Sequence, residues 1–283
     1  MDFSAALRGA DRDAYLATLF APEAVRPSLA ALALYQAELS RIVSRANEPL
    51  AAEVRLQWWR DAIRDEGFGA GTSVPLVEAL RAGMERYAWP ADTLCAISEA
   101  RIHDLYADPF ADLDQFDGYA GEVFGAPMQL TAMALATEAF GGRDGLGIAR
   151  SAGTAAGYGG VVCAAAEAVL GERSRLERGR THVPDAVWQE AGGANVRDDL
   201  AAQRTPPALE AAMTKMITHG LDAAANMLAS VAGLPPAVRM AVLPAFGPAR
   251  ALRRGLHNPG AVRQPGPLVR QWHLWRDARR LGR

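Results

Sequence analysis

Apolar residues recur every three or four positions along most of the chain, which is the period of an amphipathic α-helix. Residues 23–46 show the pattern clearly, because Leu29, Leu32, Tyr35, Leu39 and Ile42 fall on one helical face. The same pattern predicts further helices over residues 48–66, 74–87, 92–106, 113–140, 147–170, 207–231, 236–256 and 268–280. No stretch of useful length alternates polar and apolar residues, so we expect no β-sheet.

The distribution of Gly and Pro residues and the composition of the chain indicate a single helical domain. Gly and Pro residues are spread evenly between the predicted helices, without a long low-complexity linker. Alanine, the best helix former, supplies about a fifth of the residues. We predict an all-α, single-domain helical bundle of about eight to ten helices over residues 1–283, in which residues 258–283 form a basic C-terminal extension and helix.

Charge and cysteine content narrow the function classes. The formal net charge of −2 argues against a nucleic-acid partner. No apolar run is long enough to suggest a membrane-spanning helix, and the first residues do not resemble a secretory signal. Cys95 and Cys163 lie in apolar helical windows, where we expect them to act as small buried hydrophobes. These features predict a cytoplasmic protein.

A tryptophan pair is the most distinctive local feature, in the segment Arg-Leu-Gln-Trp-Trp-Arg-Asp at residues 55–61. On a helix Trp58 and Trp59 point about 100° apart, so they pack against different neighbours or form one broad wall. Arg55 and Gln57 are candidates to line a polar cleft beside them. Two interpretations stay open: a packing element, or a contact with a ligand or partner.

Metal-dependent chemistry has only weak support in the residue spacing. Asp61 and Asp65, and likewise Asp104 and Asp108, are four residues apart, which places two carboxylates on one helical face as a magnesium–diphosphate site needs. Each pair has the simpler interpretation of solvated or helix-end charge. The five histidines are scattered, and no zinc, phosphate-loop or dinucleotide motif occurs. We therefore expect no metal and no cofactor.

The predicted C-terminal helix combines basic and aromatic side chains. They are Arg270, Arg276, Arg279, Arg280 and Arg283, with Trp272, Leu274 and Trp275. A helix of this kind over residues 268–283 is suited to an anionic membrane surface, which would place the protein peripherally at the inner face of the membrane. The alternative is a solvated basic helix that docks on the bundle through its tryptophans.

Three segments resemble motifs of the squalene/phytoene synthase family of all-α isoprenoid synthases. Residues 29–44 resemble the first motif-bearing helix of that family. Residues 119–127, beginning with Tyr119, resemble its mid-chain Tyr/Gly helix, and residues 179–184, including Arg180, are similar to its Gly-Arg-x-x-(Leu/Val)-Pro element. The likeness extends from about residue 14 to 255 and implies an isoprenoid-synthase-type helical bundle.

The departures from the family pattern concern the catalytic carboxylates. The resemblance implies two aspartate-rich motifs on facing helices that hold two prenyl diphosphates through magnesium. At the first motif this chain has Ser40 and Ser44, and our alignment of the second places Ala164 and Ala168 at its aspartates. Magnesium prefers anionic oxygen ligands, and Glu167 alone does not restore a site. We therefore expect no catalytic residue at these degenerate positions.

The loss of these aspartates resembles one branch of the family, the bacterial relatives of the mitochondrial complex I assembly factor with a squalene/phytoene synthase domain. In that branch Glu38 occupies a recurring acidic position, and residues 55–60 form the signature. The resemblance implies a non-catalytic protein that binds a lipid-like, isoprenoid-like ligand or a protein partner at the membrane. The alternative is an active prenyltransferase that condenses two prenyl diphosphates head to head, with magnesium held by Asp104 and Asp108 together with Asp61 and Asp65.

Overall fold

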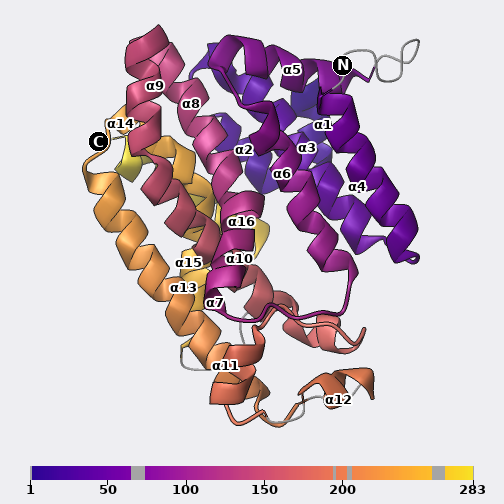
Figure 1. Ribbon diagram of the computed structural model, residues 1–283. Coiled ribbons are helices and arrows are strands. Elements are labelled where there is room, and N and C mark those ends of the chain that lie inside the picture. Colours follow the sequence, from indigo (N-terminus) through magenta and orange to yellow (C-terminus); the bar gives the residue numbers. More distant parts are fainter. Residues whose placement is uncertain (1, 65–73, 194–195, 203–205, 257–264, 283) are drawn as a thin grey trace.

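The computed structural model describes residues 2–64, 74–193, 196–202, 206–256 and 265–282, and these residues form helices and connecting turns with no strand. Figure 1 shows the helices arranged as a bundle of roughly parallel and antiparallel rods. The N-terminal part contains α1 (Phe3–Ala10), α2 (Arg12–Thr18), α3 (Arg26–Ser44), α4 (Pro49–Arg64), α5 (Pro75–Tyr87) and α6 (Ala91–Ala100). The all-α prediction is confirmed.

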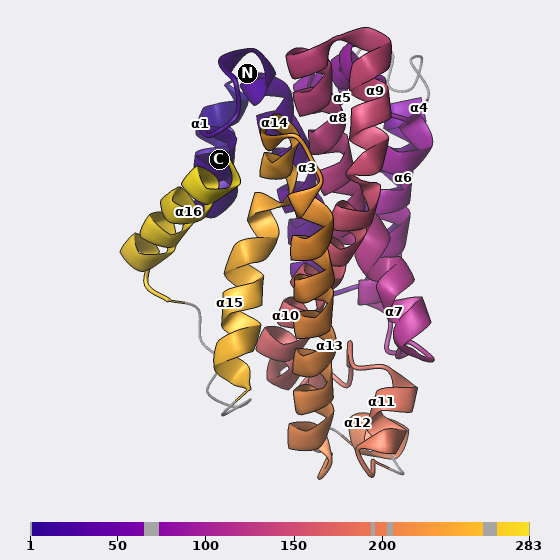
Figure 2. The same cartoon turned by 90° about the vertical axis from the view of Figure 1, so that its left-hand side faces the viewer.

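The middle of the chain supplies the core of the bundle. Its helices are α7 (Leu113–Ala120), α8 (Ala126–Phe140), α9 (Gly142–Ser151), α10 (Gly153–Leu176), α11 (Asp185–Glu190) and α12 (Val196–Ala201). The C-terminal part contains α13 (Leu209–Ala232), α14 (Pro236–Arg239), α15 (Phe246–Gly255) and α16 (Pro267–Leu281). Figure 2 shows α13 and α15 running beside each other, with α16 along the edge of the bundle, where it packs against α2 and α15.

Several predicted helices are divided in the structure. The expected helix over 92–106 ends at Ala100 and continues as a 3-10 turn, Arg101–Leu105. The segment 147–170 lies in two helices, α9 and a longer α10. Pro244 lies in a 3-10 turn, Met240–Ala245, that divides the segment 236–256. Together with the unpredicted α1 and α2, these breaks give more helices than the eight to ten expected, so that number is wrong.

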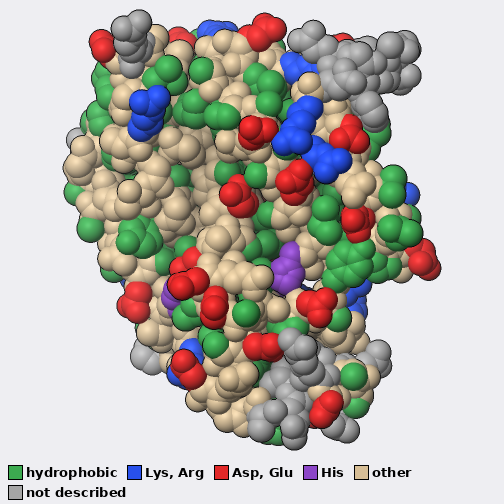
Figure 3. Space-filling model, viewed as in Figure 1, with side chains coloured by type: hydrophobic (Ala, Val, Ile, Leu, Met, Phe, Trp, Pro, Cys, Tyr) green, Lys and Arg blue, Asp and Glu red, His purple; other side chains and the backbone are tan. Residues whose placement is uncertain are grey.

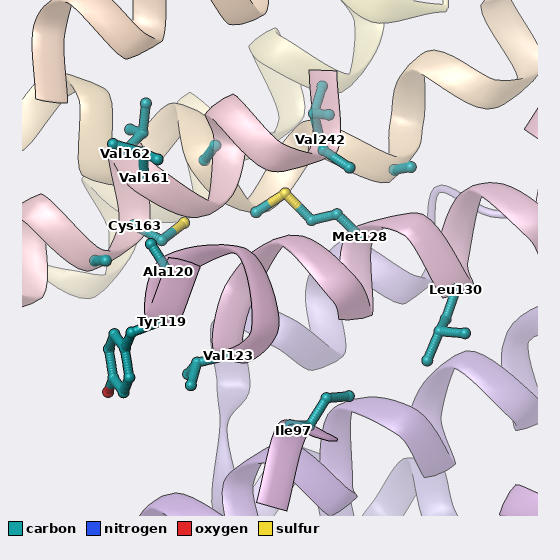
Figure 4. Packing of buried hydrophobic residues seen from close by; sticks show 14 of the residues in the cluster. Ile97, Tyr119, Ala120, Val123, Met128, Leu130, Val161, Val162, Cys163 and Val242 are labelled. Atoms are coloured by element: carbon teal, nitrogen blue, oxygen red, sulfur yellow. The ribbon is translucent and has the colours of Figure 1, made fainter. Parts of the chain in front are cut away.

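Helix α10 is the central element, packed against α13, α15, α8 and the π-helical turn Gly121–Gly125 that joins α7 to α8. Small residues permit this approach: a Cβ on Gly160 would lie 2.6 Å from the carbonyl oxygen of Ala120. Figure 4 shows Val161, Val162 and Cys163 of α10 near Ala120 and Met128. In the described part, α10 is the one helix long and apolar enough to cross a membrane, and 67% of its most apolar window is buried inside the protein.

The surface is mixed in charge and polarity. On the face that Figure 3 shows, acidic and basic side chains are interspersed with apolar ones. The larger exposed apolar side chains include Leu50 and Val54 on α4, and Leu268, Trp272 and Trp275 on α16. One of our two interpretations was that the two tryptophans dock α16 on the bundle. Their exposure shows that they do not.

Candidate functional site

A cavity of about 800 Å³ lies among α2, α3, α8, α10, α15, α16 and the 3-10 turn before α15. Most of its wall is apolar, and includes Leu29, Leu32, Ala33, Phe124, Met128, Leu135, Leu170, Met240, Leu243 and Leu274. Ligand pockets of proteins span about 300 to 1,000 Å³ and combine apolar walls with a few polar groups, so this cavity has the size and lining of a ligand site.

Helices α3 and α10 contribute the polar side chains on two sides of this cavity. Gln36 and Ser40 reach it from α3, whereas Cys163 and Glu167 reach it from α10. Ser40 thus lines the cavity, while Ser44 is exposed at the end of α3 and does not line it. The motif position on α3 that faces the cavity carries a neutral hydroxyl.

The two alanines that we aligned with the second motif lie elsewhere on α10. Ala164 and Ala168 are buried in the helical packing, at 2% and 0% exposure, and neither lines the cavity. The carboxylate that α10 presents to the cavity is that of Glu167. Among these residues of α10, Cys163 and Glu167 line the cavity, whereas Ala164 and Ala168 do not.

The guanidinium of Arg101 joins the elements at this end of the cavity. Its Nη1 donates to Oδ2 of Asp104 at 3.0 Å and to the hydroxyl of Tyr119 at 3.3 Å, and its Nη2 donates to Oγ of Ser40 at 3.2 Å. The carboxylate of Glu167 lies 3.7 Å from the same Nη1. A cation therefore lies between the α3 motif position and the carboxylate of α10.

Asp104, which contacts Arg101 directly, makes further contacts of its own. Its Oδ1 accepts from the hydroxyl of Tyr119 at 2.8 Å and lies 3.1 Å from Nε2 of His182, and its carbonyl oxygen accepts from Nη1 of Arg180 at 3.1 Å. The structure thus brings together Asp104, Tyr119 and Arg180, which the sequence singled out separately. The structure adds Arg101 and His182 to this group, which the sequence analysis did not single out as site residues.

The electrostatics of this cluster keep Asp104 ionised. Burial alone would raise the pKa of this carboxyl, but the hydrogen bond from His182 and the charge of Arg101 hold it well below its usual range. Burial raises the pKa of Tyr119 well above its ordinary value, so its hydroxyl keeps the proton that it donates to Asp104. The cluster is a network of charge-assisted hydrogen bonds.

The Gly-Arg-x-x-Val-Pro element has a local structural reason. Gly179 has a φ of +67°, in the region that favours glycine, and this turn directs Arg180 toward the carbonyl of Asp104. Next to it, the fully buried Glu172 accepts from the hydroxyl of Thr181 and from the backbone N–H of His182 at 3.3 Å. The element therefore fixes the segment that carries His182 against α10.

The second carboxylate pair does not form a magnesium site. Asp104 is tied into the Arg101 cluster, whereas Asp108 is exposed in the irregular segment after the 3-10 turn. Asp61 pairs with Arg60 at 3.1 Å on α4, and Asp65 lies outside the described residues. The alternative function needs the carboxylates of Asp104 and Asp108 on one helical face. In the structure one is buried and the other is exposed, and they do not share a helix.

The donors at the cavity do not fit magnesium and a diphosphate either. Around the α3–α10 end they are the hydroxyl of Ser40, the amide of Gln36 and one carboxylate, that of Glu167, which already faces Arg101. Magnesium in a substrate-phosphate site takes carboxylate ligands together with phosphate oxygens, and an adjacent guanidinium opposes a second cation.

A second, smaller cavity brings the tryptophan signature next to the acidic position of α3. It measures about 450 Å³ and is lined by Glu38, Arg41, Ile42, Arg45, Arg55, Trp58 and Trp59. Glu38 is paired with Arg41 across its rim. Gln57 does not line this cavity, because its amide donates to Glu53 at 3.2 Å along α4.

The two tryptophans have different environments. Trp59 is 8% exposed and packs on Tyr35, with ring centroids 5.2 Å apart, while Trp58 is partly buried and meets Trp59 edge-on at the same centroid separation. The ring of Trp59 is therefore a core element, and the ring of Trp58 lines the smaller cavity. The packing interpretation therefore holds for Trp59, and a contact of Trp58 with a ligand or partner stays a prediction.

The fold and cavity define an all-helical protein of the isoprenoid-synthase type. Residues 7–276 match the squalene/phytoene synthase family, and the chain belongs to that family. Among solved structures it is similar to the squalene synthase HpnC from Alicyclobacillus acidocaldarius, with 17% identity, a TM-score of 0.67 and coverage of 91% of this chain and 94% of the other. It is also similar to a dehydrosqualene synthase in complex with ligand, with 13% identity, a TM-score of 0.72 and coverage of 98% and 94%. No curated protein matches the chain.

Proposed function

We propose that this family member binds a long apolar, isoprenoid-like ligand in the α3–α10 cavity and does not condense prenyl diphosphates. One observation carries the proposal: the cavity keeps apolar walls, while its α3 motif position is Ser40 and the facing carboxylate, Glu167, is next to Arg101. Apolar walls bind a hydrocarbon chain by removing its surface from water. The condensation chemistry needs anionic metal ligands, which Ser40 does not supply.

The rival function is a working head-to-head prenyltransferase. The names of the structural neighbours, a squalene synthase and a dehydrosqualene synthase, favour it. Against it stand the separation of Asp104 from Asp108 and the saturation of Asp104 by Arg101, Tyr119 and His182. These contacts support binding without turnover.

The proposed setting is the cytoplasmic face of a membrane, where the protein would bind a protein partner, as the resemblance to an assembly factor implies. The Trp58–Arg55–Glu38 cavity supports a partner contact, because it offers an aromatic wall beside arginines. The C-terminal helix supports membrane contact, because Leu268, Val269, Trp272 and Trp275 are exposed. Arg276 and Arg279 lie over the rings of Trp272 and Trp275, at 5.0 and 4.8 Å from the centroids.

Cavity binding is tested with N-phenyl-1-naphthylamine, an apolar dye that fluoresces out of water, and with farnesol as the competitor. We expect the wild-type protein to bind the dye and farnesol to displace it. Ala33→Phe fills the cavity from α3 and should weaken both ligands severalfold, whereas Ala51→Phe on the exposed side of α4 should leave binding unchanged. Absence of farnesol binding, or equal binding by Ala33→Phe, contradicts the proposal.

A further inference from the structure

The charges at the α3–α10 end of the cavity are already balanced within the protein. Arg101 is the cation, and its side chain is 7% exposed. It faces the carboxylate of Asp104 at 3.0 Å and that of Glu167 at 3.7 Å, so one positive charge meets two negative ones. His182 lies against Asp104 on the far side from Arg101, at 3.1 Å. With Arg180, whose Nη1 donates to the carbonyl oxygen of Asp104, two arginines balance the two carboxylates of the cluster.

The hydrogen-bonding capacity of Arg101 is also largely used. Its two terminal nitrogens donate to Asp104, Tyr119 and Ser40, and the guanidinium lies over the ring of Phe124, at 5.2 Å from the centroid. An incoming anion would have to displace one of these partners. The exposed part of the cluster that remains open to the cavity is the carboxylate of Glu167, whose side chain is 43% exposed.

On the α15–α16 side of the cavity, Arg250 and Arg270 face carboxylates, whereas Arg254 is exposed on α15 without an ion pair among the described residues. Arg250 pairs with the buried Asp277, and Arg270 lies 3.2 Å from Asp13 on α2. These pairs hold α16 against α15 and α2. The positive charges of Arg250 and Arg270 are therefore compensated by neighbouring carboxylates before a ligand arrives.

An anionic head group at the α3–α10 end of this cavity would lie near Glu167, and Arg101, the cation next to it, already faces two carboxylates. Transfer of an uncompensated charge from water into a cavity with apolar walls is strongly unfavourable. A neutral hydroxyl or carbonyl oxygen has no such penalty. A hydroxyl can donate to the carboxylate of Glu167, and either group can accept from the amide of Gln36 or the hydroxyl of Ser40.

We infer that the α3–α10 end of the cavity selects long-chain isoprenoid-like ligands with an uncharged oxygen head group, such as an alcohol or a ketone, over the diphosphates of the same chains. The inference rests on the proposed function, because it names the head group of the ligand proposed there. Arg101 occupies the place of a bridging cation, and Glu167 excludes a second anion. The selection therefore does not require magnesium.

The test compares farnesol with farnesyl diphosphate, two ligands with the same chain, by displacement of N-phenyl-1-naphthylamine from the wild-type protein. We expect farnesol to bind at least about tenfold more tightly, with or without added magnesium. Repulsion between Glu167 and one uncompensated negative charge changes a dissociation constant by about that factor. Glu167→Gln removes the repelling charge, so its affinity for farnesyl diphosphate should rise severalfold while that for farnesol stays within twofold or so.

Glu177→Gln is the matched control. Glu177 caps the same helix, is exposed and does not line the cavity, so its change alters the net charge equally and should affect neither ligand. Farnesyl diphosphate that binds as tightly as farnesol would overturn the head-group selection while leaving the cavity function in place. An unchanged preference in Glu167→Gln overturns the role of Glu167. Binding of neither ligand overturns the proposed function and the selection with it.

Discussion

The guanidinium of Arg101 and the carboxylate of Asp104 form a buried ion pair, in which Nη1 lies 3.0 Å from Oδ2 and the two side chains are 7% and 4% exposed. The pair links the 3-10 turn after α6 to Ser40 on α3 and Tyr119 on α7. Removal of one partner from such a pair leaves the other charge buried without compensation. We therefore expect the cluster to be essential to the stability of this end of the bundle.

Substitution Asp104→Asn should lower the free energy of unfolding by about 3 kcal/mol at neutral pH, because Arg101 and His182 lose their central partner. The pKa of Asp104 is lower in the folded protein than in the unfolded chain, so its contribution is present above the unfolded pKa of about 4 and is lost as pH falls below it. Denaturant unfolding of both proteins at pH 7 and pH 3 tests this. A difference that grows toward pH 3 would contradict the assignment.

The tryptophan pair should respond unequally to truncation. Trp59→Ala removes a ring that is 8% exposed and packed on Tyr35, so a loss of about 3–5 kcal/mol in unfolding free energy is expected. Trp58→Ala removes a partly buried ring at the smaller cavity, and we expect a loss of about 1 kcal/mol. Chemical denaturation of the two variants measures both values. Equal losses would show that the rings do not have separate roles.

Two glycines of α10 give a matched test of helix packing. A Cβ on Gly160 would lie 2.6 Å from the carbonyl oxygen of Ala120, whereas a Cβ on Gly157 would have no atom of this kind within 4 Å. Gly160→Ala should therefore destabilise the protein by about 1–3 kcal/mol, and Gly157→Ala should stabilise it by about 0.5–1 kcal/mol through the helix propensity of alanine. Thermal unfolding of the pair decides. A neutral or stabilising Gly160→Ala is incompatible with the close approach at the π-helical turn.

The C-terminal helix should bind anionic vesicles through its exposed aromatic side. Trp272 and Trp275 are 54% and 47% exposed, and Arg276, Arg279 and Arg280 are exposed nearby. A basic residue near an anionic leaflet contributes about 1 kcal/mol, and salt of about 0.5 M screens most of it. Of the five arginines in the original pattern, Arg270 pairs with Asp13 and Arg283 lies outside the described residues.

Sedimentation with phosphatidylserine-containing and purely phosphatidylcholine vesicles provides the measurement. We expect salt-sensitive binding to the anionic vesicles only, and its loss in the double variant Trp272→Ala with Trp275→Ala. The control is Leu50→Ala with Val54→Ala, which truncates two exposed apolar side chains on α4. Binding that survives the α16 variant, or that is equal for both vesicle types, would assign α16 a structural role instead.

The sequence predicted the helical class because the apolar period of residues such as Leu29, Leu32 and Leu39 is set by burial of one face, and these residues are buried in α3. It could not orient α10 in the same way. Residues around the whole circumference of α10 are small and buried, so periodicity does not show which face meets α3. The sequence therefore did not show that Glu167, rather than Ala164 or Ala168, lines the cavity.

The Arg101 cluster was missed for a different reason. A search for paired carboxylates finds Asp104 and Asp108 from their spacing, but it has no means to detect that the helix ends at Ala100. The 3-10 turn directs Arg101 and Asp104 into the bundle and leaves Asp108 exposed. The signal available in the sequence was Arg101, three residues before Asp104. Its other partners come from α3, α7 and α10, which are distant in sequence, so the sequence could not show the cluster.

The most direct test of binding without condensation is incubation of the purified protein with labelled farnesyl or geranylgeranyl diphosphate and magnesium, followed by extraction of apolar products. An active squalene synthase processed in parallel establishes that the assay detects turnover. Because this end of the cavity offers Ser40 and a Glu167 that faces Arg101 rather than a set of anionic metal ligands, we expect no C30 or C40 hydrocarbon above the buffer blank. A magnesium-dependent hydrocarbon product that accumulates with time and protein concentration would contradict the proposed function.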